Sequence, residues 1–407
     1  MHRVAITGLG VISALGIGKQ AHFKGLAEGV NGIRTLEMRD VDRLMIKIGA
    51  QASFDENAYF GRQEIALFDR VTQFALIAAA EAFEQSGLEI TEELGLQSAT
   101  IIATAMGGLN TQDDNYRTVY QEQKNRVHPF IIPRLMANAP VSQVSMKFGL
   151  KGPAYSVATA CASSNHAIGQ AFNLIRSGQC KAAVTGGTES VLCFGGVKAW
   201  EGLRVMSKDG CRPFAKTRNG MVLGEGCAIL ILEEWEAAKS RGAPILAELC
   251  GSGVTADATD IVAPDVSGAS RAMTLALKDA RMAPEEVTYI NAHGTATAIN
   301  DRTEAAAIRQ ALNAQADRVM VSSTKSMHGH AIGAAGALEA AAVLMSIGQG
   351  VVPPTINYDE PDPEITLDDF QNISENSNVL TVLGLTSVFF KIFKGPIVVV
   401  LASGSNC

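Results

Sequence analysis

The chain repeats one local order: a short apolar segment, a turn containing glycine, and a segment with helical period. In the first part, a helical pattern over 69–87 precedes an apolar segment at 99–103. In the second part, apolar segments at 287–291 and 319–323 precede a helical pattern over 334–347. Alternating strands and helices are typical of α/β folds. The repetition therefore predicts an internally duplicated α/β fold.

The length of the chain fits two packed halves better than one core. It has 407 residues, of which 47 % are hydrophobic, and chains of this length usually divide. A charged helical segment at 233–242 precedes a new strand expected from residue 245. We place the border there, which gives halves of 1–244 and 245–407. A last strand is expected over 397–401.

Two early segments suggest turns or loops. Residues 4–7 have the pattern of a buried strand closed by Gly8 and Gly10. With Gly16, these glycines do not have the spacing of a dinucleotide-binding loop, so we expect turns. The polar segment 107–133 is predicted to be an irregular, locally basic surface loop or lid.

Composition excludes several classes of function. The formal net charge is −7 and only 18 % of residues are charged, which gives nucleic-acid binding no electrostatic support. The seven cysteines show neither CxxC pairs nor histidine spacing, which argues against zinc and against a disulfide framework. No signal-peptide pattern occurs at the N-terminus, and no apolar run reaches the roughly 18 residues that span a bilayer. We expect a soluble, cytoplasmic protein in a reducing compartment.

Cys161 is the candidate nucleophile. It lies between a short strand pattern ending near Thr159 and a helical pattern that stops at Gly178. Unpaired backbone N–H groups and the dipole at a helix start favour the thiolate over the thiol. Ala160 and Ala162 are small enough to let a substrate approach. A buried structural cysteine is the commoner role, and the other motifs favour the catalytic one.

Two histidines follow strands in the second half. His293 lies in the sequence NAHGTAT at 291–297, and His330 ends the sequence STKSMHGH at 323–330. Residues after parallel strands line the same edge of a sheet, so both could meet Cys161. A cysteine can hold an acyl group as a thioester, and imidazole N–H groups can stabilise the enolate formed when a carboxylated extender loses CO₂. Lys325 would keep both imidazoles neutral.

Three motifs carry a family resemblance: TACASS at 159–164, NAHGT at 291–295 and TKSMHGHAIGAAG at 324–336. They resemble those of the β-ketoacyl-acyl carrier protein synthases, most closely the elongating type II condensing enzymes of the thiolase-fold superfamily. The similarity extends from Val4 to about Pro363. It implies a thiolase-like fold with two duplicated halves packed as five layers, α-β-α-β-α. It also implies decarboxylative Claisen condensation of an acyl primer with malonyl-acyl carrier protein, giving a 3-oxoacyl-acyl carrier protein.

The resemblance also assigns residues. It implies Cys161 as acyl nucleophile and His293 with His330 at the malonyl site. His328 stands where the elongating enzymes usually have threonine, so it is the less favoured catalytic histidine. The resemblance further implies Lys325, Glu339 and Asn291 as supporting residues, and Thr295 and Thr297 as binding the phosphopantetheine arm.

The implied partners follow from the same family. Acyl and malonyl thioesters are the substrates, and acyl carrier protein brings the phosphopantetheine arm. No metal and no cofactor of the chain's own is expected. The carrier is acidic in this family, so basic residues such as Arg62, Lys124 and Arg126 are docking candidates. The family also implies a homodimer or a heterodimer with a related synthase.

The C-terminal part departs from the family. Where its members have a glycine-rich gating loop, residues 386–394 read TSVFFKIFK. Alignment back from the last strand places Phe390 on a gate phenylalanine and Lys391 on a glycine, and bulky residues do not readily adopt positive φ. Three interpretations remain open: a remodelled gate, a local reading-frame error, or reduced activity.

Two further departures concern the substrate. Gln112 occupies a position that is usually apolar at the end of the acyl pocket, and the loop at 197–200, which begins at Val197, is atypical. The sequence GGVKAWE at 195–201 resembles specialised synthases of the nodulation-factor type, so we expect a dedicated secondary pathway.

Two alternatives share the fold. A chain-length-factor-like partner of another synthase usually lacks the cysteine. A thiolase using coenzyme A expects a second cysteine near the C-terminus, and Cys407 lies in no glycine-rich context.

Overall fold

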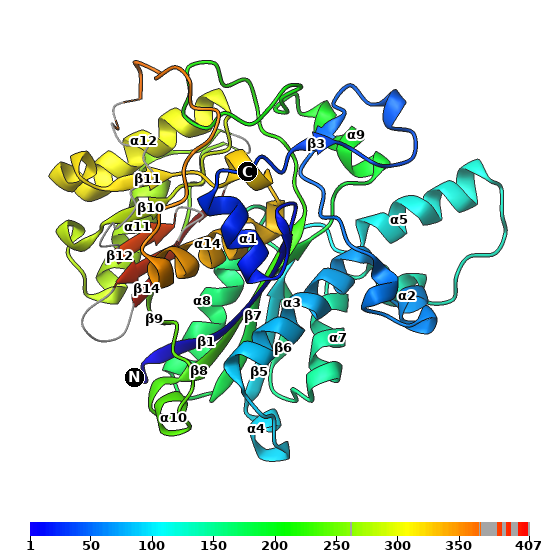
Figure 1. Ribbon diagram of the computed structural model, residues 1–407, viewed down its shortest axis with the longest axis horizontal. Coiled ribbons are helices and arrows are strands. Elements are labelled where there is room, and N and C mark those ends of the chain that lie inside the picture. Colours follow the sequence, from blue (N-terminus) through cyan, green and yellow to red (C-terminus); the bar gives the residue numbers. More distant parts are fainter. Residues whose placement is uncertain (261–262, 366, 368–380, 385–387, 392–397, 406–407) are drawn as a thin grey trace.

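The computed structural model describes residues 1–407 except 261–262, 366, 368–380, 385–387, 392–397 and 406–407. After residue 380 it describes the backbone of three strands only. Two α/β regions pack side by side, as the ribbon shows (Figure 1). The division predicted after residue 244 falls between α10 (Trp235–Ser240) and β9 (Ala247–Ala256).

The strands of the two halves follow the same order. The first half contains β1 (Val4–Ser13), β5 (Ser98–Ala103), β6 (Ala154–Val157), β7 (Ala182–Glu189) and β8 (Gly226–Glu234), arranged β1-β8-β7-β5-β6. The second half contains β9, β10 (Tyr289–Asn291), β11 (Met320–Ser322), β12 (Thr381–Gly384), β13 (Val388–Lys391) and β14 (Val398–Ser405), arranged β11-β10-β12-β13-β14-β9. Since β12 also pairs with β14, the order without β13 matches that of the first half.

The two halves share the order of their strands, but the strands do not all run in matching directions. Strand β8 runs antiparallel to both β1 and β7, whereas β14 runs parallel to both β9 and β12. Strands β1 and β9 pair antiparallel and join the two sheets.

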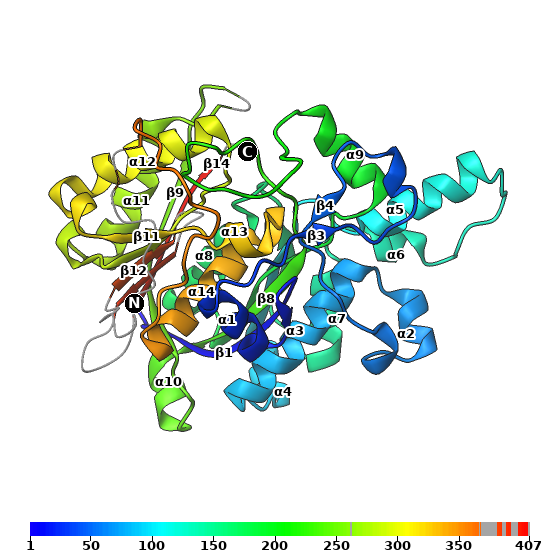
Figure 2. The ribbon, with the colours of Figure 1, turned by 45° about the horizontal axis from the view of Figure 1, so that its top comes forward.

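Helices complete five layers, which confirms the predicted arrangement (Figures 1 and 2). Helices α3 (Arg70–Ser86) and α7 (Ala139–Phe148) cover the outer face of the first sheet, and α8 (Ser163–Arg176) and α14 (Ala335–Gln349) lie between the sheets. Helix α11 (Val266–Ala280), with α12 (Ala298–Leu312) beside it, covers the second sheet. Helix α14 is apolar on nearly all sides because it contacts a sheet on each face, whereas α8 also exposes Gln170 and Asn173.

The turn expected at Gly8 and Gly10 was wrong. Strand β1 continues through both glycines to Ser13. A Cβ at Gly8 would lie 2.2 Å from the carbonyl oxygen of Ala82, and one at Gly10 would lie 1.9 Å from that of Ala78. Both glycines are therefore required by the close approach of helix α3.

Two predicted loops are helical. The segment 107–133 contains α5 (Leu109–Tyr116), a π-helical turn (Arg117–Gln121) and the start of α6 (Ile131–Leu135). Helix α5 is anchored because the buried Asp69 carboxylate accepts a 2.7 Å hydrogen bond from the backbone N–H of Thr111. The atypical residues 197–200 lie within α9 (Phe194–Gly202) and not in a loop.

One apolar stretch reaches the length that was expected to be absent from the chain. The 18 residues Ile332–Gln349 have a mean hydropathy of 1.4, sufficient by length and composition to cross a membrane. The stretch is 83 % buried inside the protein, as expected for the core helix α14 between two sheets. The prediction that no such run exists was wrong, because a central helix of a layered fold meets the same test.

Candidate active site

Cys161 lies in a strained turn between β6 and α8. Ala160 has φ +51°, a left-handed conformation that non-glycine residues rarely adopt. The Ser163 hydroxyl stabilises this turn: it donates to the carbonyl of Ala160 at 2.6 Å and accepts from the N–H of Thr159 at 2.8 Å. Such strain is found at functional sites, where surrounding contacts hold it. The turn places a buried sulfur just before the first turn of α8.

The structure brings together the three side chains that the sequence analysis places in one site. Cys161 Sγ lies 2.8 Å from Nε2 of His330, which is 169 residues away. The rings of His293 and His330 have centroids 5.3 Å apart and planes at 87°. Donor atoms of all three side chains lie within 4.8 Å of one another. Their catalytic roles remain predictions.

Both imidazoles are held neutral. Burial lowers the pKa of His293 and of His330 well below the usual value, and the nearby charge of Lys325 lowers both further. Each ring therefore has one N–H donor and one lone pair at neutral pH. Neutral donors are suited to stabilising negative charge that develops during a reaction.

Lys325 and Glu339 form a buried ion pair beside the histidines. Lys325 begins α13 (Lys325–His328), Glu339 lies on α14, and the lysine Nζ donates to Oε1 of the glutamate. Their side chains are 0 % and 1 % exposed. A buried ammonium requires such a partner because desolvation of an unpaired charge is costly. The pair anchors the α13 segment to the central helix.

A carboxylate that the sequence analysis missed holds the His293 loop. Glu304 on α12 accepts from the N–H of His293 at 2.6 Å and from that of Gly294 at 2.7 Å. Burial raises the pKa of Glu304 to about 8. Gly294 has φ +41°, and a Cβ there would lie 2.4 Å from Cβ of Ser323. The two histidine-bearing loops therefore pack in direct contact. Sequence gave no signal for Glu304 beyond its place in the following helix.

The other predicted polar residues of this loop lie close by. The hydroxyls of Thr295 and Thr297 are 3.0 Å apart, with Thr295 buried and Thr297 half-buried. Asn291 is fully buried at the end of β10, and its Nδ2 donates to the hydroxyl of Tyr289 at 3.1 Å. Asn291 thus secures the end of the strand that precedes His293.

Apolar side chains surround the sulfur. Cys161 belongs to a buried cluster that includes Val197 and Ile332. Leu109, on the helix that carries Gln112, packs against this cluster. The Nε2 of Gln112 donates at 3.0 Å to the hydroxyl of Tyr116 on the same helix, and its place in the acyl pocket stays a prediction. The backbone of Phe390 lies in β13, but its side chain and residues 386–387 and 392–394 lie outside the described residues.

A second missed carboxylate connects the two halves near the site. Glu189 accepts from the hydroxyl of Thr104 at 2.9 Å, from the N–H of Ala105 at 2.7 Å and from the N–H of Gly333 at 3.0 Å. Burial raises the pKa of Glu189 to about 7. It joins the turn after β5 to the segment just after His330. Its sequence signal was a single charge at the end of an apolar strand.

Cys161, His293 and His330 are also a possible donor set for a metal ion. Three protein ligands are too few for a structural zinc site and are the number found in catalytic ones. The buried ammonium of Lys325 lowers the pKa of both imidazoles, and the same field opposes a second cation. The electrostatics favour negative charge at this site.

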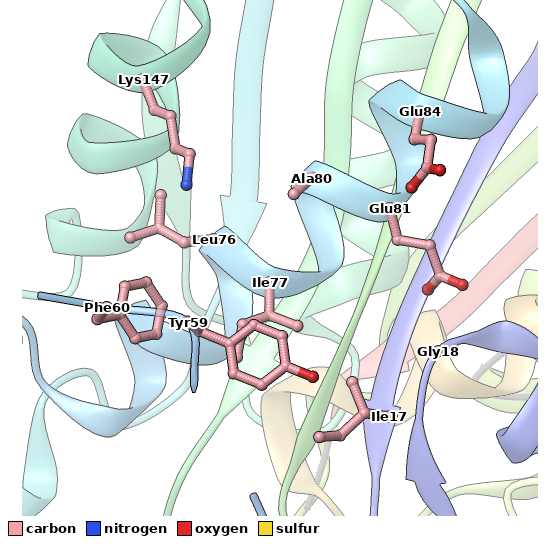
Figure 3. Close-up of a pocket in the computed structure, with 10 residues that line it drawn as sticks. All are labelled: Ile17, Gly18, Tyr59, Phe60, Leu76, Ile77, Ala80, Glu81, Glu84 and Lys147. Atoms are coloured by element: carbon pink, nitrogen blue, oxygen red, sulfur yellow. The ribbon is translucent and has the colours of Figure 1, made fainter. Parts of the chain in front are cut away.

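A separate hollow lies at the surface of helix α3, outside the first sheet. It has a volume of about 240 Å³ and is lined by α3, by Tyr59 and Phe60, and by Lys147 on α7 (Figure 3). Apolar side chains form its floor, and Glu81 and Glu84 lie along one side. Its lining residues differ from those around Cys161, so it is distinct from the site.

Comparison with known proteins gives consistent matches. A family model described as the N-terminal domain of β-ketoacyl synthase matches residues 1–238, and one described as its C-terminal domain matches residues 246–359. Nodulation protein E of Rhizobium sp. (strain N33) is 40 % identical over 381 residues, or 94 % of this chain and 95 % of that protein. The 3-oxoacyl-[acyl-carrier-protein] synthase 2 of Synechocystis sp. is 42 % identical over 375 residues, or 90 % of each.

A solved structure is similar over the whole chain. The structure titled "The ishigamide ketosynthase/chain length factor" superimposes with a TM-score of 0.89 at 32 % identity. The superposition covers 99 % of both chains.

Proposed function

The chain belongs to the β-ketoacyl synthase family, whose members have the thiolase fold, and from that premise we propose that it condenses an acyl group held on Cys161 with malonyl-acyl carrier protein. The observation that carries this proposal is the meeting of one sulfur and two neutral imidazoles within 4.8 Å. As a family member, the chain is an acyltransferase.

The first half-reaction loads the enzyme. The Cys161 thiolate attacks the carbonyl carbon of the acyl primer, and the phosphopantetheine thiol of the carrier leaves with a proton. The start of α8 and the neighbouring N–H of His330 favour the thiolate. The acyl chain would lie in the apolar cluster that contains Val197 and Ile332.

The second half-reaction forms the carbon–carbon bond. The malonyl carboxylate leaves as CO₂, and its electron pair becomes the enolate of the acetyl thioester. N–H groups of His293 and His330 donate to the enolate oxygen. The enolate carbon then attacks the thioester on Cys161, and the cysteine sulfur leaves. The product is a 3-oxoacyl-acyl carrier protein.

The proposed supporting roles follow the positions of the residues. Thr295 and Thr297 would bind the phosphopantetheine arm, which belongs to the carrier, because both hydroxyls lie in the loop after His293. Lys325, Glu339 and Asn291 would hold the two histidine-bearing segments. The chain would need no metal and no cofactor of its own, and would work in the cytoplasm.

The proposed partners are an acyl carrier protein and a second synthase chain. Arg62, Lys124 and Arg126 are exposed and would meet the acidic carrier. Strand β6 ends the sheet in the part of the chain that the structure describes, and it exposes Tyr155. An unpaired edge of this kind can pair with another chain. The solved structure titled as a ketosynthase with chain length factor supports a related synthase as the partner.

We further propose a specialised pathway for the product. The similarity to nodulation protein E supports it, although the similarity to a 3-oxoacyl-[acyl-carrier-protein] synthase 2 is as high. A role as a chain-length-factor-like partner is the second candidate, supported by the same ketosynthase/chain length factor structure. Covalent loading of Cys161 distinguishes the enzyme from such a partner.

The test is the mass of the intact protein after incubation with acyl carrier proteins of varied acyl chain. The wild type should gain the mass of one acyl group, and Cys161→Ser should gain none. Cys193→Ser is the matched control, because burial raises the pKa of that thiol to about 12 and makes it unreactive. Acylation that persists in Cys161→Ser would remove Cys161 from its role.

A further inference from the structure

We propose that His328 is a positioning residue that fixes the orientation of His330 and connects the two histidine-bearing segments. The inference rests on the proposed function and adds a residue to it. His328 is the last residue of α13, the short helix labelled in Figure 2, and it is fully buried between Lys325 and His330 in the sequence. The two hydrogen bonds of its ring join it to Gly329 and Thr324, and not to the sulfur of Cys161.

The hydrogen bonds of His328 determine its tautomer. Its Nδ1 lies 3.0 Å from the carbonyl oxygen of Gly329, and a carbonyl only accepts, so Nδ1 carries the proton. Burial lowers the pKa of His328 to about 3, so the ring is neutral and Nε2 has a lone pair. The hydroxyl of Thr324, 3.0 Å from Nε2, must therefore donate to it.

One peptide unit next to His330 is thereby held at both ends. His328 Nδ1–H donates to the carbonyl of Gly329, and the N–H of His330, on the same peptide plane, donates to the carbonyl of Val222 at 2.8 Å. The carbonyl of His330 accepts from the N–H of Gly224 at 2.9 Å. Because its backbone is held on each side, the Cα of His330 is fixed at a position from which the ring reaches Cys161 Sγ with Nε2 at 2.8 Å.

The ring of His328 is also linked, through Thr324, to the segment that bears His293. Since the hydroxyl proton of Thr324 is directed to His328, its oxygen is left to accept from Nδ2 of Asn291, at 3.5 Å. Asn291 lies two residues before His293. On the other side, the ring of His22, from α1 (Lys19–Ala27), lies with its centroid 5.9 Å from that of His328. The imidazole of His328 thus lies between the strand end before His293 and the peptide before His330.

Two amide variants separate the two ends of the ring. His328→Asn keeps an N–H donor at the Nδ1 position and loses the contact with Thr324. His328→Gln keeps a polar group at the Nε2 position and loses the donor to Gly329. The proposal predicts that His328→Gln misplaces His330 and that His328→Asn restores its position.

The first readout is the pH dependence of alkylation of Cys161 by iodoacetamide in fully reduced protein. A correctly placed N–H of His330 stabilises the thiolate, so its displacement raises the pH of half-maximal alkylation. We expect a rise of about one to two pH units for His328→Gln, since loss of one hydrogen bond to a charged group is of that size. His328→Asn should match the wild type.

The second readout is decarboxylation of malonyl-acyl carrier protein. It should fall at least about tenfold in His328→Gln, because misplacement of a catalytic group by 1 Å can cost about a hundredfold. It should fall by a smaller factor, about twofold to fivefold, in His328→Asn, which keeps the donor to Gly329 and loses the contact with Thr324. Thr324→Val, which removes the hydroxyl, and Thr324→Ser, which keeps it, give an independent pair if His328→Gln does not fold. The serine variant should be the more active of the two.

The proposal is overturned if both His328 variants shift alkylation equally, if neither does, or if Thr324→Val equals Thr324→Ser in both readouts. If both His328 variants lose activity equally, and the loss follows a fall in the thermal unfolding temperature, His328 has a role in stability alone. Alkylation of Cys161 by iodoacetamide does not require the proposed condensation reaction. If the wild type fails to decarboxylate malonyl-acyl carrier protein, the proposed function fails, and the alkylation profile still decides the role of His328.

Discussion

The sulfur of Cys161 lies 2.8 Å from Nε2 of His330, although the two residues are 169 positions apart and belong to different halves of the chain. The contact forms where the start of α8 meets the segment after α13, in the central layer of the fold. A buried ion pair, a buried carboxylate and a glycine contact hold the surrounding loops. The site thus depends on how the halves pack.

The histidines should separate the two half-reactions. His330→Ala should lower decarboxylation of malonyl-acyl carrier protein by about 10²- to 10³-fold, the size expected when one donor to a developing oxyanion is removed. Acyl transfer to Cys161 should fall much less. His328→Ala should reduce decarboxylation less than His330→Ala does. Steady-state release of CO₂ and intact-protein mass measure the two steps, and the opposite order for the two histidines would reverse their assignment.

Decarboxylation should be insensitive to pH around the usual pKa of histidine. Burial and Lys325 lower the pKa of His293 and His330, so both rings stay neutral as the pH falls from 8 through about 6.5. The rate in the enzyme–substrate complex should therefore remain level over that range and fall only at lower pH. A rate that halves near pH 6.5 and follows a single protonation would contradict the assigned neutral pair.

Stability should decrease on acidification for the same physical reason. Burial lowers the pKa of His22 to about 4, so below about pH 6.5 the unfolded chain binds a proton that the native chain excludes. The free energy of unfolding then decreases by about 1.4 kcal/mol per pH unit for this histidine, down to its native pKa. Urea denaturation at pH 6 and pH 5 should show a smaller loss in His22→Gln than in the wild type. An equal loss in both proteins would show that His22 is not buried in its neutral form.

Replacing one partner of the Lys325–Glu339 ion pair should lower the free energy of unfolding more than replacing both. Lys325→Met leaves a buried carboxylate without its cation and should cost about 3–5 kcal/mol of unfolding free energy. The double variant Lys325→Met with Glu339→Leu removes both charges and should recover much of that loss. Denaturant unfolding of the two single variants and the double variant gives the coupling energy. Additive losses would contradict a direct pairing.

Packing of α3 on β1 should be sensitive to one methyl group. Gly10→Ala places a Cβ against the carbonyl of Ala78 and should destabilise the protein by about 1–3 kcal/mol. Gly202→Ala is the matched control, since a Cβ there meets nothing within 4 Å, and its effect should stay within about 0.5 kcal/mol. Thermal and urea unfolding measure both. Equal effects would show that α3 does not approach β1 so closely.

The site was predicted best where a reactive residue directly follows a strand. Cys161 and His293 each come after an apolar strand, and parallel strands bring such positions together. Glu304 and Glu189 were missed because each acts on backbone N–H groups of a distant segment, and no period or motif marks such a contact. Gly8 and Gly10 were misassigned because their cause is a helix about 70 residues away in the chain, as the contact of Glu81 with the N–H of Val11 illustrates.

Substrate residues were harder to predict. Residues 197–200 were expected in a loop and lie in the helix α9, and Val197 belongs to the buried cluster that contains Cys161. Gln112 is expected at the end of the acyl pocket, and this stays a prediction; its amide donates to the hydroxyl of Tyr116 along α5. A side chain's direction on a surface helix depends on neighbours that a single sequence does not reveal.

A single-turnover experiment tests the account most directly. Protein carrying one acyl group on Cys161 is mixed with malonyl-acyl carrier protein, and the masses of both proteins are followed over time. The account predicts that the wild type loses its acyl mass as the 3-oxoacyl product appears on the carrier, while His293→Ala keeps its acyl mass. Wild-type protein that retains the acyl group in the presence of malonyl-acyl carrier protein would contradict the proposed condensation.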